Sequence, residues 1–448
     1  MENKKQFYKM VFALVAPMTV QNLINIGVTS ADVIMLGKVS ETVLSACSLA
    51  GQVYFVLSLI FFGLTSGAAV LTAQYWGRKD MRSIETVFGI SMDIALGVSL
   101  LFTLAAWIMP RQLMLLFTTE EAVIVEGIRY MRLVACSYTL AGMTMVYLNI
   151  MRSMEQVHIG TLVYGLSFLL NVILNAVFIF GLLGCPAMGI QGAALGTVCA
   201  RMLELAIIFI YNKKYNRVLK FHLRYLPIKN RLLLGDFFRY AVPVTLNELV
   251  WGTGMAVITA IIGHMGQAAV AANSVAQVSR QLATVVAFGI AGATSIILGK
   301  TLGEGKKELA KVYAKRLLRI AFGMGLCGVC VILAVSPIAR HFLNLSDQAK
   351  EYLQQMMYIM SYFVLCQSIG GTLIMGIFRS GGDTRIGLLV DVVAMWGFSI
   401  TTGFLAAFVF HAPVPVVYLF LVSDEVIKLP FTYRRYRSMK WLRNITRD

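Results

Sequence analysis

Long apolar runs separated by short polar segments dominate the pattern of this chain. Residues 42–77 and 249–279 contain no Asp, Glu, Lys or Arg. Because an α-helix rises about 1.5 Å per residue, about 20 residues cross the ~30 Å hydrocarbon core of a membrane. The pattern predicts twelve spanning helices, at roughly 10–36, 45–75, 86–109, 122–150, 159–183, 187–211, 236–262, 270–299, 317–336, 350–378, 385–410 and 413–433. We therefore expect an all-α polytopic membrane protein.

The two halves of the sequence repeat one another. Ala16–Leu23 (APMTVQNL) matches Val242–Leu249 (VPVTLNEL) at an offset of 226 residues, and the offset becomes 227 where Arg152–Ser153 meets Arg379–Ser380. Each half contains six spans, so both halves begin on the same side of the membrane. This predicts two parallel six-helix bundles related by a pseudo-twofold axis along the membrane normal.

The distribution of charged residues predicts which parts of the chain face the cytoplasm. The chain is 58% hydrophobic and 14% charged, with a net charge of +17, whereas a soluble protein has roughly 25% charged residues. The basic residues gather in alternate loops, which is the positive-inside pattern of an inner-membrane protein with both termini in the cytoplasm. This distribution favours contact with lipid head groups over nucleic-acid binding. We expect an N-terminal lobe at 1–211, a cytoplasmic linker at 212–235, a C-terminal lobe at 236–433 and a basic cytoplasmic tail at 434–448.

Asp32 is the only charged residue between Met10 and Gly37. A carboxylate inside a membrane-spanning helix costs at least ~2.5 kcal/mol on insertion scales, and such residues usually mark ion or substrate pathways. The same helix contains Pro17, which removes a backbone hydrogen bond and favours a kink. We interpret Asp32 as a coupling acid and Pro17 as a hinge.

Other polar side chains share helix faces with this acid or with each other. Residues 7 and 11 apart lie on the same face of a helix. Such faces in the N-terminal half carry Gln21, Asn25, Tyr164, Asn171 and Asn175, and Thr197 adds a hydroxyl on the sixth span. They predict a polar cavity around Asp32, with amide bridges between helices as the alternative.

The C-terminal half has Ile258 at the position of Asp32. Its candidate cavity residues are Glu248, Arg280 and Asp391. Glu248 and Arg280 are expected to form either a structural ion pair or a substrate contact, and Asp391 to be a second cavity acid or an interfacial residue.

Two further groups have the spacing of local ion pairs on one helix. They are Arg201 with Glu204, and Asp424 and Glu425 with Lys428. Pairs three or four residues apart on a helix are neighbours, so we interpret these groups as structural.

Enzyme motifs are absent from the sequence. There is no Walker A lysine motif, and the five histidines lie in or near loops without a metal-ligand spacing. Transport must then be driven by an ion gradient or run downhill, with no cofactor. The alternatives to an antiporter are a flippase for lipid-linked saccharides and, from another class, a membrane-embedded enzyme.

Several motifs resemble those of multidrug and toxic compound extrusion (MATE) transporters. Pro17 followed by Asp32 in DVIMLGKVS resembles the first-helix motif, and FRSGGDTR (Phe378–Arg385) resembles the turn between the tenth and eleventh helices. Leu169–Asn175 and Gly189–Thr197 match the fifth helix and the start of the sixth. The similarity extends over essentially the whole chain.

This resemblance implies that Asp32 is the ion-coupling acid, with Asn171, Asn175 and Thr197 around it. Some members carry Asp where this chain has Asn175, and others carry a seventh-helix Glu where this chain has Trp251. The resemblance therefore implies neither a sodium site made only of acidic residues nor the C-terminal ion site of the members that carry the seventh-helix Glu.

From these features we expect a monomeric secondary antiporter that exports amphipathic, cationic drugs. The favoured coupling ion is H⁺, with Na⁺ at Asp32 as the alternative and no other metal. A proton needs one basic site, whereas Na⁺ gains from each additional anionic oxygen. Neutralisation of Asp32 would bend the first helix near Pro17 and release the substrate.

Overall fold

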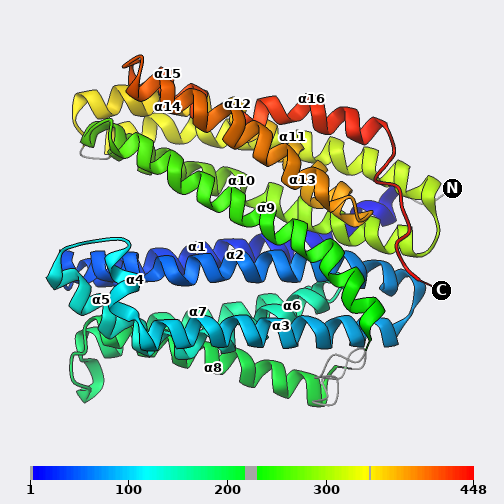
Figure 1. Ribbon diagram of the computed structural model, residues 1–448, viewed down its shortest axis with the longest axis horizontal. Helices are drawn as coiled ribbons and strands as arrows, with labels where there is room; N and C mark the ends of the chain where they lie inside the picture. Colours follow the sequence, from blue (N-terminus) through cyan, green and yellow to red (C-terminus); the bar gives the residue numbers. More distant parts are fainter. Residues whose placement is uncertain (1–3, 217–229, 343–344, 448) are drawn as a thin grey trace. The chain divides into compact units, whose positions relative to one another are not determined.

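The computed structural model describes residues 4–216, 230–342 and 345–447, which form helices and connecting turns without a strand (Figure 1). The first half contains α1 (Lys4–Gly37), α2 (Glu41–Arg78), α3 (Met81–Ile108), α4 (Pro110–Leu115), α5 (Glu121–Val134), α6 (Cys136–Ser153), α7 (His158–Phe180) and α8 (Ile190–Lys214). A 3₁₀ turn, η1 (Leu182–Gly184), lies between α7 and α8.

The second half contains α9 (Arg231–Gly263), α10 (Gln267–Gly303), α11 (Lys307–Phe342), α12 (Asp347–Gly371), α13 (Thr384–Asp391), α14 (Thr401–Phe408), α15 (Val414–Leu421) and α16 (Asp424–Arg437). Two π-helical segments interrupt this half: η3 (Thr372–Phe378) continues α12, and η4 (Val392–Ile400) joins α13 to α14.

The described helices confirm the predicted all-α polytopic membrane protein. Ten of them are long and apolar enough to cross a membrane, and α5 with α6, bent by 49° at their junction, makes an eleventh. The predicted twelfth span corresponds to α15 and α16. It is less apolar because α16 carries Asp424, Glu425 and Lys428 in its first turns.

Contacts divide the chain into two compact units. Unit 1 consists of Met1–Thr19, Ala73–Lys79 and Val242–Asp448, and unit 2 of Val20–Thr72 and Asp80–Ala241. In unit 1, α10 packs against α11 and α12; in unit 2, α7 packs against α8 and α3 against α6. The predicted lobe boundaries at 211 and 236 remain a prediction, and 217–229 of the linker lies outside the described residues.

The first helix of each repeat passes from one unit to the other close to its proline. In α1 the passage follows Thr19, two residues after Pro17, and in α9 it follows Ala241, two residues before Pro243. A proline inside a helix removes one backbone hydrogen bond and weakens the helix at that point. In α1 and in α9, the proline therefore lies close to the point that separates the part in unit 1 from the part in unit 2, and a bend there would change the angle between these two parts of the helix.

Glycines allow a backbone contact between α2 and α10 within unit 1. A Cβ atom at Gly303 would lie 1.9 Å from the carbonyl oxygen of Gln74, and one at Gly77 would lie 2.2 Å from that of Lys300. Gly303 and Lys300 follow Gly77 and Gln74 by 226 residues. The repeat thus forms the same close approach twice, and any side chain at either glycine would separate the helices.

The C-terminal segment folds back onto unit 1. Gln74 donates to the carbonyl oxygens of Ser380 (2.7 Å) and Arg443 (3.1 Å), and its own side-chain oxygen accepts from the Ile445 amide at 2.8 Å. Trp441 is fully buried. The part of the predicted basic tail that the structure describes is therefore packed against α2 and the turn after η3.

Candidate functional site

Asp32 is held by an asparagine from another helix of unit 2. Asn175 of α7 donates from Nδ2 to Asp32 Oδ1 at 2.6 Å and to Asn171 Oδ1 at 3.3 Å. Both asparagines are buried, whereas Asp32 is partly exposed. The structure therefore brings together three of the four predicted ion-coupling residues, which we call the Asp32 site (Asp32, Asn171 and Asn175).

The carbonyl side of Asn175 faces α8. A Cβ atom at Gly196 would lie 2.4 Å from Asn175 Oδ1, so the absence of a side chain at Gly196 leaves space for this amide. Asn175 Oδ1 is buried and has no hydrogen-bond partner among the described residues. Buried oxygens are usually paired, and an unpaired amide oxygen beside a carboxylate has the chemistry needed to bind a hydrated proton or a cation.

Two of the predicted residues lie at the edge of this site. Thr197 follows Gly196 on α8, and its hydroxyl donates to the Ala193 carbonyl of the same helix at 3.0 Å. Asn25 is exposed, and its carbonyl accepts from Thr29 at 3.2 Å. Neither makes a direct hydrogen bond to Asp32.

Gln21 lies farther along α1 and has buried partners. Its Nε2 donates to the Val157 carbonyl and to Thr161 Oγ1, each at 3.0 Å, and its Oε1 accepts from Arg152 NH2 at 2.7 Å. Only 2% of Gln21 is exposed. Gln21 thus joins α1 to α6 and α7, a role that its place on the helix face did not reveal.

Tyr164 lies among charged side chains that connect α7 to α8. It interacts electrostatically with Arg152, Arg201 and Glu204. Arg201 donates to Glu204 at 2.8 Å, which confirms the predicted local pair, and Glu204 also accepts from Ser167 at 2.7 Å. Arg201 acts electrostatically on Asp32 as well, so this pair places a compensated positive charge near the Asp32 site.

In unit 1, one of the two alternatives for Glu248 and Arg280, a structural ion pair between them, does not occur. Glu248 of α9 instead pairs with Arg379, the residue after η3, at 2.7 Å, and both are buried. Arg379 also donates to Asn247 at 3.2 Å. A helix face does not determine which neighbouring helix lies opposite it, so the sequence could not identify the partner of Glu248.

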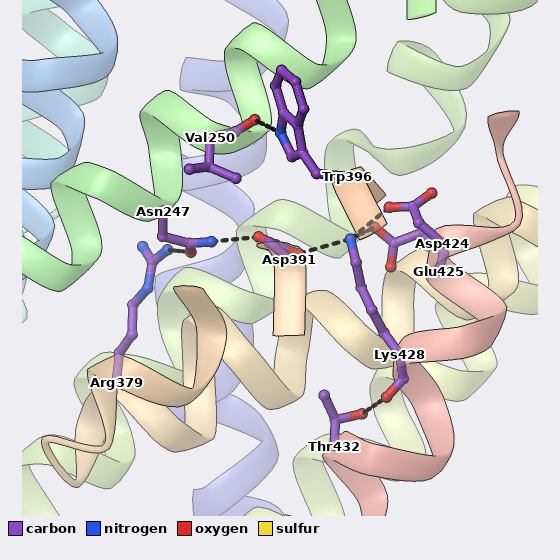
Figure 2. Close-up of polar contacts among 9 residues, drawn as sticks. All are labelled: Asn247, Val250, Arg379, Asp391, Trp396, Asp424, Glu425, Lys428 and Thr432. Atoms are coloured by element: carbon purple, nitrogen blue, oxygen red, sulfur yellow. Dashed lines mark hydrogen bonds and ion pairs between the residues drawn. The ribbon is translucent and has the colours of Figure 1, made fainter. Parts of the chain in front are cut away.

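Asn247 continues the network to a second group of charges (Figure 2). Its amide donates to Asp391, which pairs with Lys428 of α16 at 2.8 Å. Lys428 also contacts Asp424 at 2.6 Å and Glu425 at 3.3 Å, as the spacing on α16 predicted. We call Asp391, Asp424, Glu425 and Lys428 the Lys428 cluster. Asp391 is therefore a buried member of an ion-pair cluster.

The π-helical segments lie beside this network. Arg379 directly follows η3, and Asp391 directly precedes η4. A π-helical turn adds a residue to the helix and shifts the side chains that follow, and such turns are frequent at functional sites. The segment η3 therefore influences which way Arg379 faces, and nothing in the apolar pattern of these spans indicates either π-helical segment.

The internal repeat contains a signal for the buried contacts of Arg152 and Arg379, which sequence reasoning missed. Arg152 and Arg379 are 227 residues apart, as are Arg201 and Lys428. Arg152 donates to the side-chain amide of Gln21 on α1, the first helix of its repeat. Arg379 donates to that of Asn247 on α9, the first helix of the second repeat. Basic residues at equivalent positions of two apolar halves are therefore a sign of buried networks.

Arg280 lines a pocket within unit 1. Its Nε donates to Gln277 Oε1 at 2.9 Å, and its guanidinium carbon lies 6.0 Å from the ring centre of Phe363. Both acidic residues Asp424 and Glu425 also line this pocket. Arg280 thus forms no ion pair among the described residues, but Asp424 and Glu425 attract it electrostatically.

Comparison with known proteins gives a consistent result. The family model MatE matches residues 17–177 and 243–405. The chain is 20% identical to the "Uncharacterized transporter YisQ" of Bacillus subtilis, over 96% of this chain and 94% of that protein. It is 22% identical to the "Probable multidrug resistance protein NorM" of Thermotoga maritima, over 98% and 94%. A crystal structure of MATE in the bent conformation superposes with a TM-score of 0.86 at 19% identity, over 97% of this chain and 96% of that one.

Proposed function

We propose a function on the premise that this chain belongs to the MatE family of multi-pass membrane transporters, as the match over 17–177 and 243–405 shows. It is a monomeric secondary antiporter of the cytoplasmic membrane that exports amphipathic, cationic drugs. The name of the Thermotoga relative, a multidrug resistance protein, supports the substrate class. Entry of H⁺, or of Na⁺ as the alternative, drives the export.

The observation that carries this proposal is the contact between Asp32 and Asn175. It places the only acid of the first apolar run against a buried amide of α7, at 2.6 Å. A carboxylate held in this way is kept at one position and is still partly open to solvent. It can therefore exchange a proton or a cation for the positive charge of a substrate.

Pro17 provides a physical route from ion binding to movement. It lies fifteen residues before Asp32 on the same helix. Two residues after it, α1 leaves unit 1 and continues in unit 2. Protonation of Asp32 removes the charge that attracts a cationic substrate. In the proposed cycle, α1 then bends near Pro17 and the substrate leaves to the outside.

The flippase and enzyme alternatives have less support. A saccharide carrier for lipid-linked substrates would need a large central cavity rich in arginine, and Arg280 is the main candidate of that kind. A membrane-embedded enzyme would need a catalytic group of side chains. Among the described residues, no group of three or more His, Cys, Asp or Glu is arranged to hold a metal ion.

The coupling ion can be tested with purified protein in liposomes. We expect a pH gradient at equal Na⁺ to drive drug antiport, and a Na⁺ gradient at equal pH to give only the background rate of Asp32→Asn. The physical reason is that the Asp32 site has one carboxylate and two neutral amides, whereas Na⁺ gains from further anionic oxygens. Transport driven by Na⁺ without a pH difference would identify Na⁺ as the coupling ion instead.

The predicted topology can be tested by cysteine labelling in a variant without the seven native cysteines. Lys220→Cys, in the segment 217–229 outside the described residues, should be protected from an impermeant thiol reagent added to intact cells. The reason is that the basic segment around it should face the cytoplasm. Lys38→Cys, in a loop predicted to lie outside, is the matched control and should be labelled. Labelling of both variants from outside would refute the proposed orientation.

A further inference from the structure

The C-terminal segment, residues 438–447, is bound to the end of α2 (Figure 1). The contact begins at Gln74, which is fully buried. Its Nε2 donates to the Arg443 carbonyl at 3.1 Å, and its Oε1 accepts from the Ile445 amide at 2.8 Å. The same Nε2 donates at 2.7 Å to the carbonyl of Ser380, in the turn after η3. One side chain of α2 thus joins the C-terminal segment to a turn of the second repeat.

Arg78 extends this contact by about one helical turn. It donates from NH1 to Thr446 Oγ1 and to the Arg447 carbonyl, each at 3.0 Å. The amide of Arg447 donates to the hydroxyl of Tyr75 at 3.4 Å. Together with the bonds of Gln74, these bonds attach the segment to three side chains of α2.

The start of the C-terminal segment is packed firmly against the second repeat. Trp441 is fully buried, and beside its carbonyl oxygen there is no room for a Cβ atom at Gly381. Just before the segment, Arg435 of α16 pairs with Asp383 through two hydrogen bonds of 2.7 and 2.9 Å. The segment therefore has one end packed within the second repeat and one end hydrogen-bonded to α2, a helix of the first repeat.

The helix that the segment holds belongs to both units. Residues of α2 up to Thr72 lie in unit 2, whereas Ala73–Lys79 lies in unit 1. The helices α1 and α9 also pass between the units and carry a proline two residues from the passage, but α2 contains no proline. A helix without proline keeps its backbone hydrogen bonds and resists a sharp bend. Movement of one unit against the other is therefore transmitted to the end of α2.

We propose that the C-terminal segment is a latch on the cytoplasmic end of α2, which must release this end during each transport cycle. The inference rests on the proposed antiport, because a transporter that alternates between two states has to move its units. The basic residues at the end of α2 favour the cytoplasmic side. In the closed latch, the end of α2 lies against α10, where Gly77 and Gly303 allow backbone contact.

The bonds of the latch are of a kind that can be exchanged. Arg78 is exposed, so its guanidinium is hydrated as soon as Thr446 and Arg447 move away. The amide of Gln74 and its partners likewise bond to water once they are separated. Exchange of a hydrogen bond within the protein for bonds to water changes the free energy only modestly. The latch can therefore hold one state without preventing the other.

The first test joins the latch to α2 covalently. In a variant without the seven native cysteines, Arg78→Cys and Thr446→Cys are linked by ethylene bis-methanethiosulfonate, a short reagent that replaces the reach of the Arg78 side chain. Drug transport in proteoliposomes should fall to the background rate of Asp32→Asn. It should recover when a reductant cleaves the link. Mass spectrometry measures the linked fraction.

Arg111→Cys with Glu121→Cys is the matched control, because the native side chains form an exposed ion pair of 2.8 Å outside unit 1. Linking this pair should leave transport unchanged. If the first pair is inactive before linking, Arg78→Cys with Arg447→Cys replaces it, since Arg78 also bonds to Arg447. Unchanged transport by protein whose latch is fully linked would overturn the proposal.

A distance measurement tests the latch without relying on transport. Spin labels at Lys79→Cys, at the end of α2, and at Lys306→Cys, beyond the end of α10, report the separation of these ends in liposomes by double electron–electron resonance. Gln74→Leu removes three bonds of the latch. It should raise the ratio of long to short distances about tenfold, because a net hydrogen bond contributes roughly such a factor. Gln348→Leu, the same change at an exposed glutamine, should leave the ratio as it is.

The two measurements separate the latch from the export function. A single distance in both the parent protein and Gln74→Leu would refute the latch, even if the protein transports drug. If no drug is transported under any ion gradient but Gln74→Leu shifts the distances as expected, the export function fails and the latch is supported.

Discussion

Cells expressing Asp32→Asn should accumulate cationic drug as strongly as cells without the transporter, although the variant reaches the membrane and folds. Asn has the shape of Asp and can still accept the hydrogen bond that Asn175 donates at 2.6 Å. It cannot take up a proton or hold a cation by charge, so coupling should be lost completely. The measurement is efflux of a fluorescent cation from energised cells, with the amount of protein determined by immunoblotting.

The matched control for this change is Asp347→Asn, the same substitution at an exposed residue at the start of α12. It should leave efflux at the wild-type rate. The thermal unfolding temperatures of both variants in detergent should lie close to that of the wild type. Undiminished efflux by Asp32→Asn would remove the acid from the centre of the mechanism.

The largest loss of stability is expected for Lys428→Met. Lys428 is 1% exposed and is shared by Asp391, Asp424 and Glu425. Removing one partner of a buried ion pair typically costs about 3–5 kcal/mol because the remaining charge is left unpaired. Here the loss would leave three neighbouring carboxylates, so we expect the free energy of unfolding to fall by about that amount. Thermal or denaturant unfolding of the purified protein measures it.

Two further variants separate the charge effect from the loss of packing. Lys350→Met removes a lysine from an exposed pair with Asp347, 3.9 Å apart, and should cost less than about 1 kcal/mol because such pairs are weak. Adding Asp391→Asn to Lys428→Met should restore part of the lost stability, since one of the unpaired charges is then neutral. A double variant that is less stable than Lys428→Met would show that charge is not the cause.

The Asp32 site was largely predictable from sequence. Asp32 is alone in an apolar run, and the seven- and four-residue spacings of Tyr164, Asn171 and Asn175 place them on one face of α7. The structure joins Asp32 to Asn175 and Asn171. The roles of Thr197 and Asn25 stay predictions; the hydroxyl of Thr197 donates within its own helix.

The sequence by itself determined the helices and much of the polar content of their faces. In a membrane, each backbone polar group must be paired within its own segment, so the length of an apolar run defines a span without knowledge of its neighbours. The same local rule gave the pairs of Lys428 with Asp424 and Glu425, and of Arg201 with Glu204, because residues three or four apart on one helix always meet.

Only the tertiary structure decided the contacts between helices. Glu248 pairs with Arg379 rather than Arg280, and Asp391 meets Lys428 from another helix. These choices depend on the rotation and axial position of each helix against its neighbours. Both follow from packing of the whole unit and, for Arg379, from the π-helical segment η3 that precedes it. Helical periodicity contains neither quantity, so the sequence identified the charged residues but left their partners undetermined.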